Sequence, residues 1–304
     1  MTISIRVAIS LSFSTTMAVF SRLLPTITSA YAVQALFALI FVPQQNEIYY
    51  DLCGAVGWMS STALSLYYPA LKAKYWTGIA GATIPAISSF APRQVLLTAA
   101  VGLWSLRLGS FLAERAIKAG GDSRFDQIKK QPLKFTYYWI AQATWITLVG
   151  LPIFMVNALP ARVHPALSRL DYLGLGIWGT SLLVEVIADR QKTKWRKAKN
   201  NKQHEEQFIS SGLWSISRHP NYVGEVGIWA GIWTMAYSSL QSGAYPRGAP
   251  ALAALSPLFT WFLIRNVSGV PPLERAGDKR FASNPKWAAY KASVPIFWPW
   301  GSTK

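Results

Sequence analysis

The chain has 304 residues, of which 51% are hydrophobic and 14% are charged, whereas an ordinary soluble domain carries about 25% charged residues; this excludes a water-soluble globule and a disordered chain. The lone Cys53 excludes an intrachain disulfide scaffold, and 30 Lys and Arg against 13 Asp and Glu give a formal net charge of +17. The composition therefore predicts an all-α fold, a polytopic membrane helix bundle in contact with the lipid bilayer.

The N-terminal residues 1–46 contain no acid, carry Arg6 and Arg22, and are rich in Ser and Thr. This composition is typical of a mitochondrial or plastid targeting sequence, but it also suits a first membrane span with a short polar lead. Both interpretations stay open for residues 1–30. We expect residues 31–304 to form a single membrane domain.

The membrane spans are predicted from the length and apolarity of each stretch, because a spanning helix requires about 20 mostly apolar residues. Six stretches qualify: 51–71, 93–113, 135–158, 170–188, 222–240 and 251–269. Two weaker stretches are 31–42, which is short, and 76–90, which Pro85 interrupts. We expect about seven transmembrane helices, within a range of six to eight.

The basic residues are concentrated in three segments, at 115–134, 190–218 and 265–304, which together hold 21 of the 30 Lys and Arg. Successive spans place these three segments on one side of the membrane. By the positive-inside rule, the basic loops and the C-terminal tail are cytoplasmic.

Two acids lie at the cytoplasmic end of the stretch 170–188. Glu185 and Asp189 are four residues apart and share one helix face, and seven Lys and Arg follow within residues 190–202. Either these cations anchor the helix at anionic lipid headgroups, or the segment binds a polyanionic ligand. In the second interpretation the acids hold hydroxyl or amide groups and the cations hold phosphates.

A polar motif, Gly212-Leu-Trp-Ser-Ile-Ser-Arg-His-Pro-Asn-Tyr-Val-Gly-Glu225, leads directly into the stretch 222–240. An ionisable residue inside a span is costly and usually faces a cavity or a partner. We therefore expect Glu225 to pair with a cation, with Arg218 as the candidate. The three histidines show no metal-ligand spacing, and the positions of the cations beside the spans favour lipid or cofactor phosphates over nucleic acid.

This motif resembles the signature of the steroid 5-alpha-reductase superfamily, in particular its DUF1295 branch. Further segments that fit the branch are Arg107-Leu-Gly109, Gly121-Asp-Ser-Arg-Phe125, Glu185-Val-Ile-Ala-Asp-Arg-Gln-Lys192, Ser268-Gly-Val-Pro-Pro-Leu-Glu274 and Tyr290-Lys-Ala-Ser-Val-Pro-Ile-Phe-Trp-Pro299. The resemblance covers residues 95–304.

The resemblance implies a membrane-embedded NADPH-dependent reductase that transfers a hydride to the conjugated C=C of a sterol-like or other lipidic enone, in the endoplasmic reticulum. Its polar groups for the nucleotide are Asp189 and Asn221, and Glu225 braces the phosphate partners. The remaining residues of the implied cofactor site are Arg107, Arg115, Arg196 and Arg218 as phosphate partners, Tyr222 and Tyr290 as lining residues, and Glu185 and His219 from the matched motifs.

The catalytic residues are not assigned, because the stretch 51–71 has no acid in its interior and Trp104, near Arg107, has no proton to give up usefully. Two other functions stay open. One is an S-adenosylmethionine-dependent carboxyl methyltransferase of the isoprenylcysteine type, whose Arg-His-Pro-Asn-Tyr stretch is similar. The other is a non-catalytic membrane protein of the same fold that binds lipid or cofactor.

Overall fold

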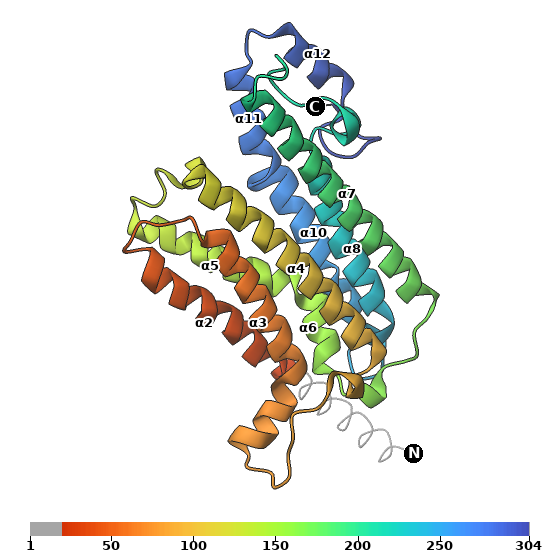
Figure 1. Cartoon of the computed structure of the whole chain (residues 1–304). Helices are drawn as coiled ribbons and strands as arrows, with labels where there is room; N and C mark the ends of the chain where they lie inside the picture. The colour runs from red at the N-terminus through yellow and green to blue at the C-terminus, as the bar shows by residue number, and fades with distance from the viewer. Residues whose placement is uncertain (1–19, 304) are drawn as a thin grey trace. The chain divides into compact units, whose positions relative to one another are not determined.

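The computed structural model describes residues 20–303, and all regular structure in this range is helical, with no strand (Figure 1). The α-helices are α2 (Leu23–Phe41), α3 (Tyr50–Leu71), α4 (Pro92–Ala119), α5 (Pro132–Val149), α6 (Leu151–Ala158), α7 (Arg169–Asn200), α8 (Pro220–Leu240), α9 (Ala249–Ala253), α10 (Leu255–Phe262), α11 (Val270–Arg280) and α12 (Pro285–Ser293). Short helical turns lie at Lys72–Trp76, Ile87–Ser89, Ser123–Phe125, Ala161–Val163, Gly212–Ser215 and Leu263–Val267. The expected all-α fold is confirmed.

Four helical segments of the described range are long and apolar enough to cross a membrane: α2, α4, α7 and the stretch Ala249–Arg280, which comprises α9 to α11. The pair α5 and α6 forms a fifth if it is counted as one span, with a bend of 58° between the two helices. Helices α3 and α8 have 22 and 21 residues, but neither contains an 18-residue stretch as apolar as those of the candidate spans. The chain is thus a multi-pass membrane protein, and the predicted count of about seven spans is not confirmed.

The predicted weak span at 76–90 is wrong. Residues 77–86 contain no helix, and the single short turn in the rest of the stretch is Ile87–Ser89. Gly78 and Gly81 adopt φ angles of +58° and +78°, a left-handed conformation that interrupts a helix. Pro85 follows and lacks the N–H that a helix interior requires.

At the N-terminal end, α2 begins at Leu23, so the short stretch predicted at 31–42 is the second part of a longer candidate span. The alternatives of a targeting sequence and a first span also concern residues 1–19, which lie outside the described residues.

The chain divides into two compact units. Unit 1 comprises the residues up to Tyr172 together with Ile232–Leu255, and unit 2 comprises Leu173–Gly231 and Ser256–Lys304. In unit 1, α3 packs against α2 and α4, and α2 also packs against α5. An aromatic cluster lies between these helices. In it, the Trp139 ring stacks on the Phe41 ring, with 6.1 Å between the ring centroids. Unit 2 holds most of the predicted cofactor residues.

Candidate functional site

The segment that carries the polar motif is held in place by its backbone and side chains within unit 2. Gly212 has a φ of +62°, and a Cβ there would meet the Gln191 side chain at 2.5 Å. The indole of Trp214 donates a hydrogen bond to the carbonyl oxygen of Ala188 at 3.1 Å. The backbone N–H of Arg218 donates to the carbonyl oxygen of Pro295 at 2.9 Å. These bonds fix the motif between α7 and the C-terminal segment.

Arg218 and His219 share one carboxylate partner, Glu274 of α11. Arg218 Nη1 donates to Glu274 Oε2 at 2.6 Å, and His219 Nε2 lies 2.8 Å from Glu274 Oε1. Arg218 Nη2 also donates to the carbonyl oxygen of Thr303 at 2.7 Å. Both side chains are almost fully buried, so the carboxylate neutralises a cation that would otherwise be costly to bury.

This arrangement corrects the predicted Arg218–Glu225 ion pair. Arg218 precedes the first turn of α8 and its side chain contacts α11, whereas Glu225 lies more than one turn further along α8. Glu225 is 8% exposed and accepts a hydrogen bond from the indole N–H of Trp229 at 2.9 Å. The motif correctly predicted that Arg218 forms a buried ion pair, but the predicted partner was wrong.

His219 is neutral, because burial lowers its pKa by more than the Glu274 carboxylate raises it. A carboxylate can only accept hydrogen bonds, so the proton lies on Nε2 and is donated to Glu274. The opposite nitrogen, Nδ1, is then a hydrogen-bond acceptor. It is buried and has no partner in the described part of the chain, and the same holds for the donor Arg218 Nε.

A buried donor and a buried acceptor without partners are each costly unless a ligand satisfies them. A carboxamide offers a carbonyl oxygen to a donor and an NH₂ group to an acceptor, and the nicotinamide ring carries such a group. The residues therefore fit the nicotinamide nucleotide that the sequence predicts. Tyr222 adds an apolar surface here, since its ring stacks on the His219 ring at 5.7 Å with an interplanar angle of 10°.

Helices α7 and α8 approach closely within unit 2. A Cβ at Gly224 would lie 2.7 Å from the carbonyl oxygen of Ser181, and a Cβ at Gly231 would lie 2.6 Å from the Trp178 nitrogen. Small residues at a helix interface permit this distance between backbones. The close approach of the two helices places Asn221 next to Asp189, and Asn221 Nδ2 donates a hydrogen bond to Asp189 Oδ1 at 3.4 Å.

The two predicted acids of α7 are both buried: Glu185 is 3% exposed and Asp189 is 8% exposed. Beyond them, α7 continues with its cation-rich end to Asn200. Lys192 Nζ lies 4.4 Å from the centre of the Trp214 ring, which orients this ammonium by a cation–π contact. Arg196 is exposed on the same helix end. The cations thus remain accessible to a polyanion, while the acids are held inside.

The other predicted residues differ in their surroundings. Tyr290 is 9% exposed, and its hydroxyl donates to the Trp214 carbonyl oxygen at 2.6 Å, so it holds the motif in place. Arg107 and Arg115 are on α4 in unit 1. Arg107 lies over the Phe111 ring at 5.4 Å, and Arg115 is exposed. Their phosphate contacts stay a prediction.

Glu274 is the residue of this site that the sequence interpretation missed. It ends the quoted segment that begins at Ser268, and the burial of the Arg218 guanidinium required a carboxylate partner. That requirement indicated an acid, but residues 218 and 274 are 56 positions apart, and spacing alone does not pair them.

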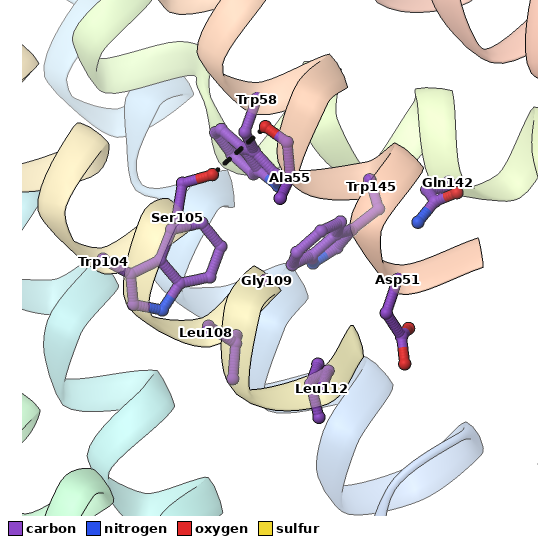
Figure 2. Close-up of a pocket in the computed structure, with 11 residues that line it drawn as sticks. Asp51, Ala55, Trp58, Trp104, Ser105, Leu108, Gly109, Leu112, Gln142 and Trp145 are labelled. Atoms are coloured by element: carbon purple, nitrogen blue, oxygen red, sulfur yellow. Dashed lines mark hydrogen bonds between the residues drawn. The ribbon is translucent and has the colours of Figure 1, made fainter. Parts of the chain in front are cut away.

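Unit 1 contains a small pocket between α3, α4 and α5, shown in Figure 2. Its walls include Trp58, Trp104 and Trp145, and Asp51 lies at one side. Asp51 is at the edge of the stretch whose interior lacks an acid. The cavity has a volume of about 60 Å³.

A family model described as a protein of unknown function, DUF1295, matches residues 73–294. This confirms the predicted resemblance to that family, and the matched range includes every predicted site residue. No curated protein and no solved structure gives a significant match.

Proposed function

The chain belongs to the DUF1295 family, and we propose that it is a membrane-embedded NADPH-dependent reductase acting on the conjugated C=C of a lipidic enone. The observation that carries the proposal is the buried group of Arg218, His219 and Glu274, with an unpartnered donor and an unpartnered acceptor. We place the enzyme in the endoplasmic reticulum, with the basic loops cytoplasmic as the positive-inside rule predicts.

Each part of the site has a distinct role in holding the cofactor. Arg218 Nε donates to an acceptor oxygen, and neutral His219 accepts through Nδ1. Asp189 and Asn221 bind hydroxyl or amide groups. The cations at the end of α7 bind phosphates, which suits NADPH, whereas S-adenosylmethionine carries no phosphate.

Bound NADPH supplies the hydride. The protein residues hold the nicotinamide ring in one orientation, which converts an encounter in solution into a reaction of fixed geometry. Charge develops on the substrate carbonyl oxygen in the transition state and requires a hydrogen-bond donor. No residue is assigned to that role.

Replacement of Asn221 or Asp189 by alanine tests the cofactor site. Each substitution is expected to weaken NADPH binding 10- to 100-fold, roughly 1.4–2.8 kcal/mol, because a buried polar contact to the nucleotide is lost. Titration calorimetry on the purified protein in detergent measures the dissociation constant. Asn201→Ala, at an exposed position beyond α7, is the control and should bind as wild type. Wild-type affinity in both test variants would remove these residues from the site.

A further inference from the structure

The segment 72–91, between α3 and α4, exposes large apolar side chains although it is not a membrane span. Figure 1 shows it as an excursion from the end of α3 that returns to the start of α4. Trp76 is 72% exposed and Tyr75 is 65% exposed. The other exposed apolar side chains of the segment are Ile79, Ile84 and Ile87.

Hydrogen bonds within the segment fix its backbone. The Thr77 N–H donates to the carbonyl oxygen of Lys72, and the Ile79 N–H donates to that of Ala73, both at 3.0 Å. At the other end, the Phe90 ring packs edge-on against Tyr67 of α3 at 5.1 Å. The segment therefore has a defined conformation in which the apolar side chains point outward.

The charge of the segment has one sign. Lys72 and Lys74 are its only ionisable cationic side chains, and the chain carries no acid between Asp51 and Glu114. Segments that combine Trp and Tyr with Lys are favoured at the interface between lipid headgroups and acyl chains. The aromatic rings are amphipathic, and the ammonium groups contact lipid phosphates.

The segment also adjoins one end of a candidate membrane span. It ends directly before Pro92, where α4 begins. Helix α4 has 28 residues, a length of about 42 Å, which exceeds the hydrocarbon thickness of about 30 Å. At least one end of this candidate span therefore extends into the headgroup region. The segment 72–91 adjoins one of these two ends.

We propose that residues 72–91 form an interfacial anchor that lies in the headgroup region of the bilayer. Trp76, Tyr75 and Ile79 reach the upper acyl chains, and Lys72 and Lys74 contact lipid phosphates. The occupant of this apolar surface is lipid, not a second copy of the chain.

The test uses a single cysteine in the full-length protein. Cys53 is the only native cysteine and is buried, so a Cys53→Ala background allows labelling at Trp76→Cys with an environment-sensitive fluorophore. The labelled protein is reconstituted into vesicles of phosphatidylcholine and phosphatidylglycerol. Nitroxide lipids labelled near the headgroup and aqueous iodide are the two quenchers. Lys130→Cys, at an exposed position in the polar segment between α4 and α5, is the control.

The proposal predicts that headgroup-level nitroxide quenches the label at position 76 at least twofold more than the label at position 130. Iodide should quench it at least fivefold less. Ile79→Cys should give the same result and replaces Trp76→Cys if that variant does not fold. Equal iodide quenching at positions 76 and 130, without lipid quenching, would overturn the proposal. Self-quenching at position 76 that persists when the protein is diluted into excess lipid would identify a second copy as the occupant and would overturn it too.

Discussion

Glu274→Ala is expected to lower the free energy of unfolding by about 3–5 kcal/mol, because it leaves a buried charge without its partner. The Arg218 side chain is 2% exposed, and Glu274 is its only carboxylate partner in the described residues. His219 loses the acceptor of its Nε2 proton in the same substitution. The variant should also bind NADPH more weakly, since Arg218 and His219 are no longer held in position.

Thermal unfolding of the purified protein in detergent measures this effect. Asp278→Ala is the matched control on the same helix, because Asp278 forms an exposed pair with Lys291 at 2.6 Å. Exposed pairs contribute about 0–1 kcal/mol, so this control should unfold close to wild type. Equal melting temperatures for Glu274→Ala and Asp278→Ala would show that Glu274 does not stabilise the buried cation.

Arg93→Ala is expected to destabilise unit 1 by a similar amount, about 3–5 kcal/mol. Arg93 forms a bidentate ion pair with Asp171, in which Nε donates to Oδ1 at 2.6 Å and Nη2 donates to Oδ2 at 2.8 Å. Both side chains are 1% exposed. Arg93 Nη1 also donates to Ser239 Oγ at 2.8 Å. Removal of the guanidinium leaves the Asp171 carboxylate buried without its cation, whereas Ser239 Oγ keeps its contact with His164 Nδ1 at 2.8 Å.

The loss of stability in Arg93→Ala should come from the uncompensated charge of Asp171 and not from loss of the ion pair itself. The double variant Arg93→Met/Asp171→Leu, which removes both charges, should therefore recover most of the lost stability. Arg162→Ala, at an exposed position in unit 1, is the control. A melting temperature of Arg93→Ala that matches the control, or a double variant less stable than the single one, would contradict this account.

The sequence predicted helices best where long apolar stretches have clear helix starts. Helix α8 begins at Pro220, which suits the first turn of a helix because the ring lacks the N–H that is unpaired there anyway. Hydropathy failed at 76–90, where Trp and Ile suggested a span but two left-handed glycines and Pro85 prevent a helix. Apolar composition does not separate a spanning helix from an exposed interfacial segment.

For the candidate site, the sequence identified which polar residues are buried but not all of their partners. The positions of Asp189 and Asn221 followed from the motifs that precede and follow the basic segment, and the structure brings them into contact. The pairing of Arg218 with Glu274 depends on how α11 packs against the motif, which is a tertiary contact. Local spacing favoured Glu225, because it is the nearer acid along the chain.

The melting temperature of the purified protein with NADPH, NADH or S-adenosylmethionine tests which cofactor the protein binds. A ligand that binds only the folded state stabilises it by about 2.7 kcal/mol at a hundredfold excess over its dissociation constant. We expect the melting temperature to rise with NADPH, to rise less with NADH, which lacks the additional phosphate, and not to change with S-adenosylmethionine. A rise with S-adenosylmethionine alone, or no rise with any of the three, would contradict this expectation.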